Sequence, residues 1–279
     1  IPPQNVPSSL LEQVDEWTRI IGLELGIRGC YNIQFAIHDE LLYVLEVNPR
    51  GSRTFPFVAK STGIPLARIA ARVALGERLS DLEIPNPQTD AVCVKAPVFP
   101  FIKLRGLDPA PGPEMKSTGE VMGSHVRASA AYLKARLATE LPVPTEGGVY
   151  ITVKDEDKHA IIPLAERLKD MGFQIYATRG TSRVLRGVGG VDVQTCYRIA
   201  EGRSPDALDL MRQGKIQLVI NTPRSTGGAV LDGNMMRRLA VELNIPFVTT
   251  MAGAKMEVEA VKEARNGMPE PRLLQIKSL

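Results

Sequence analysis

The sequence predicts an α/β and α+β protein with two units of different kinds: an antiparallel sheet with helices, followed by a doubly wound parallel α/β domain. A chain of 279 residues is long for one domain and short for three. Residues 142–148 have the pattern Pro-x-Pro-x-x-Gly-Gly. The prolines block continuation of a helix, and the two glycines favour neither helix nor strand. After this segment, strands alternate with helices, a pattern that predicts a parallel sheet covered on both faces. We therefore expect a first unit at 1–141, a linker at 142–147 and a second unit at 148–279.

The first unit combines helices with short strands. Ser8 or Ser9 caps a helix whose apolar residues recur at helical spacing as far as Gly26. Two apolar runs flank His38-Asp39-Glu40 and predict an antiparallel hairpin, whose second strand ends at Asn48-Pro49 because proline lacks a ladder donor. The expected elements are a helix over 8–26, strands over 31–37 and 41–47, helices over 54–62 and 65–76, strand pieces at 92–94 and 98–101, and a helix over 127–140.

The second unit is more regular. Short apolar runs bounded by glycine or polar residues alternate with segments of helical periodicity. Strands are predicted over 149–153, 173–178, 191–195, 217–221 and 247–250, and helices over 157–171, 181–187, 205–213, 232–243 and 255–265.

Composition excludes several classes of protein. With 44% hydrophobic and 23% charged residues and a formal net charge of +3, the chain is neither a disordered polymer nor a polyanion-seeking tail. No apolar run approaches the roughly 18–20 residues of a membrane span. An aromatic content of 5% and a near-neutral charge do not support nucleic-acid binding. We expect no nucleic-acid partner and no membrane partner.

Cysteine usage and the start of the chain suggest a compartment. Cys30, Cys93 and Cys196 are widely spaced, odd in number and without a C-x-x-C pattern, which argues against a disulfide scaffold and a zinc site. The chain opens Ile1-Pro2 with no secretory signal. We expect a cytoplasmic protein and a chain cut from something longer.

The predicted hairpin carries polar residues at one end. Glu46 and Asn48 project from the same strand face, and closure by a three-residue loop would place Gln34 opposite Glu46. A carboxylate and two amide oxygens suit Mg²⁺, which prefers oxygen ligands. Arg50 and Arg53 follow, with guanidinium groups able to hold phosphate or carboxylate oxygens.

An ordinary surface pair of Glu46 and Arg50, with Gln34 facing solvent, is an equally good interpretation of the spacing alone. Buried apolar neighbours favour a structured sheet face over that alternative. The residues that we expect to be buried are Tyr31, Ile33, Phe35, Leu45 and Val47.

These residues also carry a family resemblance. Asn32-Ile33-Gln34-Phe35 and the segment Leu45–Thr54 resemble the metal-binding end of an ATP-grasp domain. The match continues through Pro56–Ala67 and Gly112–Gly123, and there it resembles the large subunit of carbamoyl phosphate synthetase. The resemblance implies that Gln34, Glu46 and Asn48 bind the Mg²⁺ or Mn²⁺ ions on the ATP phosphates, with Gln34 and Glu46 also binding ATP, and that Arg50 and Arg53 neutralise the transferred phosphoryl group or hold carbamate as catalytic residues.

The same resemblance implies an activity. The family is an ATP-dependent ligase that makes carbamoyl phosphate from bicarbonate, ammonia released from glutamine, and ATP, for pyrimidine and arginine biosynthesis. Its partners are a small glutaminase subunit, contacted through a part absent from this chain, and further copies of the large subunit. The strand lysine and glycine-rich loop of the ATP site would precede this chain, so we expect the chain alone to lack synthetase activity. Because the ATP-grasp tail runs directly into the α/β unit, the resemblance assigns it to the half that phosphorylates carbamate.

In the second unit, polar residues follow several predicted strands. Ligands of doubly wound sheets bind beyond the carboxyl ends of the strands. Thr178-Arg179-Gly180-Thr181 opens a helix whose free N–H groups favour an anion, and phosphate is the natural occupant. Any one such residue is more often only a helix cap. The residues at these ends are Lys154 and Lys158, Thr178 and Thr181, Asn221 and Thr222, and Thr249 and Thr250.

This unit resembles the methylglyoxal-synthase-like domain over 148–279. The Gly-Gly-Asp segment that supplies the base of that enzyme is missing from Glu201–Asp206. With no candidate base beside the phosphate site, binding is favoured over a lyase. The resemblance implies an allosteric domain for effectors such as UMP, IMP or ornithine, bound by Lys158, Thr178, Thr181, Arg198, Asn221, Thr222, Thr249 and Thr250. Two alternatives stay open: a stand-alone nucleoside monophosphate sensor, and a methylglyoxal-synthase-type lyase.

Overall fold

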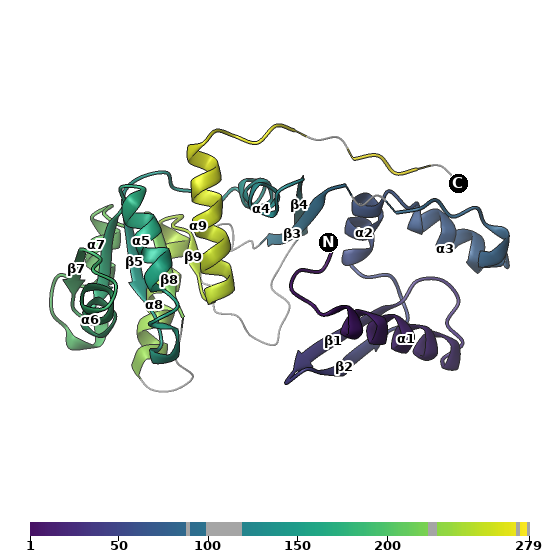
Figure 1. Cartoon of the computed structure of the whole chain (residues 1–279), viewed down its shortest axis with the longest axis horizontal. Helices are drawn as coiled ribbons and strands as arrows, with labels where there is room; N and C mark the ends of the chain where they lie inside the picture. Colours follow the sequence, from purple (N-terminus) through teal and green to yellow (C-terminus); the bar gives the residue numbers. More distant parts are fainter. Residues whose placement is uncertain (88–89, 99–118, 223–227, 272–273, 278–279) are drawn as a thin grey trace. The chain divides into compact units, whose positions relative to one another are not determined.

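The computed structural model describes residues 1–87, 90–98, 119–222, 228–271 and 274–277. These residues fall into two compact units (Figure 1). The first comprises Ile1–Val94, Ser124–Arg127 and Pro271–Leu279, and the second comprises Lys95–Gly123 and Ala128–Glu270. Within the described residues no helix is long and apolar enough to cross a membrane.

The first unit begins with one long helix and a hairpin, as the sequence predicts. Its elements are α1 (Ser8–Glu24), β1 (Asn32–His38), β2 (Leu41–Asn48), α2 (Thr54–Thr62), α3 (Leu66–Ala74) and the short 3₁₀ helix η1 (Leu79–Asp81). Gly63 ends α2 at φ 72°, a left-handed conformation that glycine adopts without strain.

The register of the hairpin depends on a shorter turn and a β-bulge, neither of which the sequence predicted. Its turn has two residues, Asp39 and Glu40, both at positive φ, and not the expected three. Phe35 pairs with Val44, but Gln34 pairs with Glu46, because Leu45 is an extra residue that forms a β-bulge. The predicted pairing of Gln34 with Glu46 is therefore confirmed, and the three-residue loop is wrong.

Burial on the hairpin is lower than expected. Leu45 is 64% exposed, so its predicted burial is wrong. The other four residues expected in the core, Tyr31, Ile33, Phe35 and Val47, are only half-buried. A two-stranded ribbon has two open faces, and the helices of this unit leave much of both faces uncovered.

Two strands, β3 (Val92–Val98) and β4 (Gly119–His125), pair with each other. The predicted strand piece at 98–101 lies outside the described residues beyond Val98. Residues 112–118 of the family motif also lie outside them, whereas Gly119–Gly123 belongs to β4. Helix α4 (Ala128–Leu137) follows and packs against the last helix, α9 (Met251–Arg265), although the sequence grouped it with the first unit. The domain limits 1–141 and 148–279 remain a prediction.

The second unit holds a parallel sheet of five strands in the order β7-β6-β5-β8-β9. The strands are β5 (Gly148–Thr152), β6 (Gln174–Thr178), β7 (Val193–Cys196), β8 (Leu218–Asn221) and β9 (Phe247–Val248). The connecting helices are α5 (Ile162–Asp170), α6 (Arg179–Gly187), α7 (Ala207–Arg212) and α8 (Gly228–Glu242), with short 3₁₀ turns η2 (Asp155–Asp157) and η3 (Ile199–Glu201).

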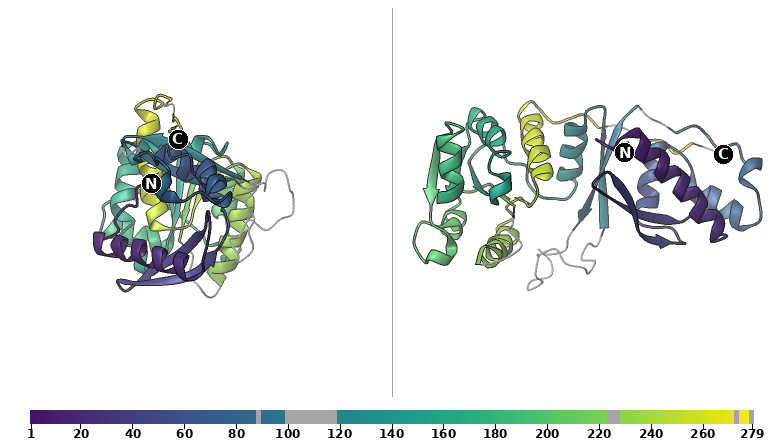
Figure 2. Two further views of the ribbon diagram at one scale, coloured as in Figure 1. Left: turned by 90° about the vertical axis from the view of Figure 1, so that its right-hand side faces the viewer. Right: turned by 60° about the horizontal axis from the view of Figure 1, so that its bottom comes forward.

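Alternate residues of each strand face different helices. Val149 and Ile151 of β5 join a core with α5, α6 and α9, whereas Tyr150 joins a second core with α7 and α8. Figure 2 shows these helices in layers on the two sides of the sheet. Because the sheet is covered on both faces, its strands are apolar throughout and only their ends are free for polar residues. The predicted doubly wound α/β fold is confirmed.

Candidate functional site

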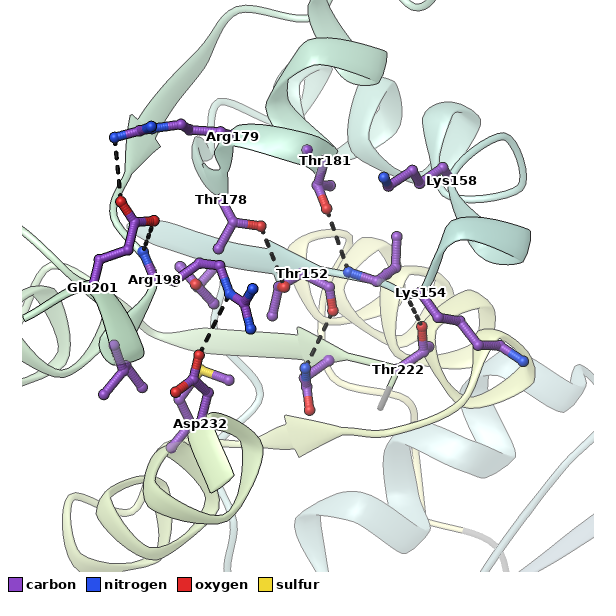
Figure 3. Close-up of a pocket in the computed structure, with 16 residues that line it drawn as sticks. Thr152, Lys154, Lys158, Thr178, Arg179, Thr181, Arg198, Glu201, Thr222 and Asp232 are labelled. Carbon is purple, nitrogen blue, oxygen red and sulfur yellow. Dashed lines mark hydrogen bonds and ion pairs between the residues drawn. The ribbon is translucent and has the colours of Figure 1, made fainter. Parts of the chain in front are cut away.

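A pocket of about 330 Å³ lies at the carboxyl ends of β5, β6 and β8, bounded by the starts of α6 and α8 and by η3 (Figure 3). Six of the eight residues predicted to bind an effector line it. These are Lys158, Thr178, Thr181, Arg198, Asn221 and Thr222.

Thr249 and Thr250 do not belong to that lining. The side chain of Thr250 instead caps α9, accepting a hydrogen bond from the backbone N–H of Gly253 at 3.0 Å. The helix-cap interpretation is therefore confirmed for Thr250, and effector binding by Thr249 and Thr250 stays a prediction. Strand β9, which precedes them, is a two-residue strand at the edge of the sheet.

Threonine hydroxyls form the wall of the pocket nearest the sheet. Thr181 Oγ1 accepts from the backbone N–H of Val153 at 3.5 Å, and Thr222 Oγ1 accepts from that of Lys154 at 3.1 Å. Each hydroxyl oxygen accepts a hydrogen bond from a backbone N–H, so the hydroxyl proton is available for donation to a ligand. Thr152 and Thr178 add two more hydroxyls, 3.4 Å apart.

Lys158 brings a positive charge to the same wall. Figure 3 shows its side chain directed toward Thr181. Its Nζ lies 2.5 Å from Asp155 Oδ1 and only 3.3 Å from the position that a Cβ at residue 180 would occupy. Gly180 therefore lets the ammonium group approach the first turn of α6, where free N–H groups already favour an anion. We call this group, Lys158, Thr178, Gly180 and Thr181, the anion cradle.

The opposite side of the pocket carries paired charges. Arg198 Nε lies 3.7 Å from Asp232 Oδ2, and Arg179 Nη2 lies 3.3 Å from Glu201 Oε2. Glu201 also accepts from the backbone N–H of Arg198 at 3.1 Å and so fixes η3. Arg179 and Arg198 thus each have an acidic partner before any ligand binds.

Asp232 is a pocket residue that sequence reasoning missed. It is only 9% exposed, and burial raises the pKa of its carboxyl, an effect that Arg198 partly offsets. The pocket therefore holds a carboxylate, on the side opposite the anion cradle, and the expected absence of a base beside the phosphate itself stays a prediction. The signal was present: Asp232 lies in the helix after β8, whose start faces the carboxyl end of the sheet.

The buried residues at or near the base of the pocket, Tyr150, Cys196 and Asn221, carry no charge near neutral pH. Tyr150 lines the pocket, and burial raises the pKa of its phenol well above the usual range. Cys196 lies in the same core, where burial raises the pKa of its thiol to about 12. Both groups keep their protons near neutral pH. Asn221 donates through Nδ2 to the carbonyl of Thr152 at 3.3 Å, and its buried Oδ1 has no partner among the described residues.

The hairpin of the first unit brings its predicted residues together as well. Gln34 and Glu46 are cross-strand neighbours, and Asn48 Nδ2 donates to Glu46 Oε1 at 2.9 Å. That bond uses the side-chain nitrogen of Asn48, so the side-chain oxygen Oδ1 is able to coordinate a cation. Arg50 and Arg53 are exposed just beyond the strand, and Arg53 lies at the start of α2. Among the described residues, no three or more His, Cys, Asp and Glu side chains lie together in a way that could hold a metal ion.

One carboxylate with two amide oxygens fits Mg²⁺ or Mn²⁺ bound together with phosphate. Such ions keep several waters and take few protein ligands when a nucleotide supplies the remaining oxygens. When bound, the ion would neutralise charge on the phosphates.

The second unit is a doubly wound α/β domain with a polar pocket at the carboxyl edge of its sheet. Residues 160–249 of it match the model of the MGS-like domain. Residues 2–82 match the model of the carbamoyl-phosphate synthase L chain, ATP binding domain. Almost the whole chain is homologous to carbamoyl phosphate synthase large chains, as the sequence resemblance predicts.

Three relatives illustrate the extent of the match. The carbamoyl phosphate synthase large chain of Methanothermobacter thermautotrophicus is 44% identical over 96% of this chain and 25% of its own length. The C-terminal sections of this large chain from Methanocaldococcus jannaschii and Methanopyrus kandleri are 42% and 43% identical over 96% and 94% of this chain, and over 45% and 49% of their own lengths. The chain thus spans a quarter to a half of the relatives that it matches. A solved methylglyoxal synthase from Elizabethkingia anophelis NUHP1 aligns with 42% of this chain and 79% of its own, at 19% identity and a TM-score of 0.33.

Proposed function

We propose that this chain is the carboxyl-terminal part of a carbamoyl phosphate synthase large chain and that its second unit binds a nucleoside monophosphate effector such as UMP. The observation that carries the proposal is the anion cradle with Asp232 opposite it in one pocket. The first unit would contribute part of the site that phosphorylates carbamate with ATP. The small glutaminase subunit and further large chains would be its partners in the cytoplasm.

The two sides of the pocket suit different parts of such an effector. Lys158, the two threonine hydroxyls and the start of α6 suit a phosphate group. A carboxylate only accepts hydrogen bonds, so Asp232 suits sugar hydroxyls, which can donate to it. A cavity of about 330 Å³ is in the range of small-ligand sites.

Calorimetric titration of the chain with UMP and with inorganic phosphate tests this function. In Asp232→Asn we expect the affinity for UMP to fall about tenfold, because an amide replaces a charged acceptor. The affinity for inorganic phosphate should not fall, because phosphate does not reach Asp232. Absence of heat with UMP, IMP and phosphate alike would contradict the proposal.

A methylglyoxal-synthase-type lyase is the second candidate, because Asp232 places a carboxylate in the pocket and the pKa of that carboxyl is raised. Proton abstraction requires a base in reach of the substrate carbon. Formation of methylglyoxal from dihydroxyacetone phosphate by the chain, lost in Asp232→Asn, would favour this candidate over the effector site.

In the first unit, we propose that Gln34, Glu46 and Asn48 bind Mg²⁺ or Mn²⁺ with ATP and that Arg50 and Arg53 contact the transferred group. Glu46→Gln should weaken Mn²⁺ binding in the presence of ADP about tenfold or more, since it removes the charged ligand. Electron paramagnetic resonance of free Mn²⁺ measures this. Glu12→Gln, an exposed change on α1, is the control and should leave binding unchanged. Equal binding by the Glu46 variant and the control would place the ion elsewhere.

A further inference from the structure

Helices α4 and α9 are joined by a buried cluster of three polar side chains: Tyr132 and Arg136 on α4 and Glu257 on α9. The carboxylate of Glu257 is completely buried. Arg136 donates to it through Nε at 3.0 Å and through Nη2 at 3.1 Å, and the hydroxyl of Tyr132 donates at 2.9 Å. Each carboxylate oxygen therefore has a partner, as a buried charge requires.

This cluster sets the position of α4 on α9. Sliding one helix along the other would leave a charge buried without its partner, which is strongly unfavourable. Apolar side chains alone would permit small shifts at lower cost. A second bond, from Ser129 Oγ to Glu263 Oε1 at 2.6 Å, fixes the two helices at another point along their length. The two helices are therefore fixed to each other at two points.

Helix α9 is connected in turn to two elements that adjoin parts of the pocket lining, α5 and β9. Arg167 of α5 lies 2.6 Å from Glu259 of α9, and α5 follows directly on the turn that carries Lys158. On the other side, α9 begins just after β9, which pairs with β8, the strand that ends in Asn221. A ligand that draws Lys158 and Asn221 together would shift α9 through both connections, α5 on one side and β9 on the other.

Helix α4 is tied at its other side to β4. A Cβ on Gly123 would lie 2.0 Å from the carbonyl oxygen of Ala131 and 2.5 Å from the backbone nitrogen of Ala135. The strand backbone therefore lies directly against the helix backbone, with no flexible side chain between them. From Gly123 the chain continues into Ser124–Arg127, which belongs to the first unit.

We propose that the Tyr132–Arg136–Glu257 cluster is a positioning device that transmits effector binding from the pocket through α9 and α4 to β4. This inference rests on the proposed effector site. The cluster contacts no ligand; it makes the two helices respond together, as a relay between two sites must.

Hydrogen exchange of the whole chain, with and without saturating UMP, tests the relay. In the wild type, UMP should slow exchange at 119–125 and 128–137 about fivefold, the lower end of couplings between sites. In Glu257→Gln, UMP should still bind with similar affinity, but the slowing at 119–125 should be lost. A purely structural cluster would change exchange in the free chain without removing the response to UMP.

Two further variants keep the test decisive. Tyr132→Phe removes one of the three bonds without unbalancing a charge and should reduce the response in part, so it replaces Glu257→Gln if that variant does not fold. Glu242→Gln, an exposed change on α8, should keep the full response. Binding of UMP with unchanged exchange at 119–137 in the wild type, or a full response in both cluster variants, would overturn the relay alone. No heat with UMP, IMP or phosphate would overturn the effector site and the relay with it.

Discussion

Replacing Arg136 with methionine should lower the free energy of unfolding of the second unit by about 3–5 kcal/mol, the usual cost of breaking a buried ion pair from one side. The Arg136 side chain is 12% exposed and that of Glu257 is fully buried, so no water can take over the role of the guanidinium. Tyr132 would remain as a neutral donor, which does not balance a charge. Hydrogen exchange of the slowest amides of β5, β6 and β8 measures the free energy of opening for this unit.

The double variant Arg136→Met with Glu257→Met separates two effects on the free energy of unfolding: the cost of leaving Glu257 without a partner, and the contribution of the intact ion pair. Because buried ion pairs replaced by apolar residues of similar volume often cost little, the double variant should recover most of the lost stability. A double variant as unstable as the single one would mean that the pair itself, and not an uncompensated charge, stabilises the unit. Exposed Arg212→Met is the matched control and should change the stability by less than about 0.5 kcal/mol.

Replacing Lys158 with methionine should weaken UMP binding roughly 10- to 150-fold, the equivalent of about 1.5–3 kcal/mol for a hydrogen bond to a charged group. Its Nζ lies beside Gly180 in the first turn of α6, and its side chain is 21% exposed, so its attraction for phosphate is only partly screened. Calorimetry at two ionic strengths measures the change, which should be larger at the lower one.

Asp155 offers a complementary variant. Its Oδ1 lies 2.5 Å from Lys158 Nζ and competes with a bound phosphate for that ammonium group. Asp155→Asn should therefore strengthen UMP binding, whereas Lys215→Met, an exposed lysine at the other end of the sheet, should have no effect. Equal UMP affinity in Lys158→Met and Lys215→Met would remove Lys158 from the site.

The fold of the second unit was largely predictable because a sheet covered on both faces has a simple sequence signal. Its strands are short apolar runs, and the residues after them, such as Lys158 and Thr178, must lie at one edge. The cap role of Thr250 could not be separated from a ligand role, since the same hydroxyl suits both. Asp232 was missed because a carboxylate near the start of a helix is ordinarily an N-terminal cap or a favourable charge there.

The partner of α4 was not predictable from local patterns. Its sequence has four buried residues, Ala130, Ala131, Leu133 and Ala135, but their periodicity does not say which helix covers them. Glu257 gave no signal either, because a glutamate within a helix is usually exposed and only its distant partners on α4 make its burial possible.

The bulge at Leu45 changes the curvature of the hairpin without changing which residues pair across it. Leu45 has no cross-strand partner, and the pairs on either side of it, Phe35 with Val44 and Gln34 with Glu46, would be consecutive without it. Removal of that one residue should thus preserve every pairing, including the one between the proposed metal ligands Gln34 and Glu46. What the extra residue adds is curvature, because a bulge bends and twists its strand. Related chains could therefore gain or lose it and keep the same ligands while aiming them in a different direction.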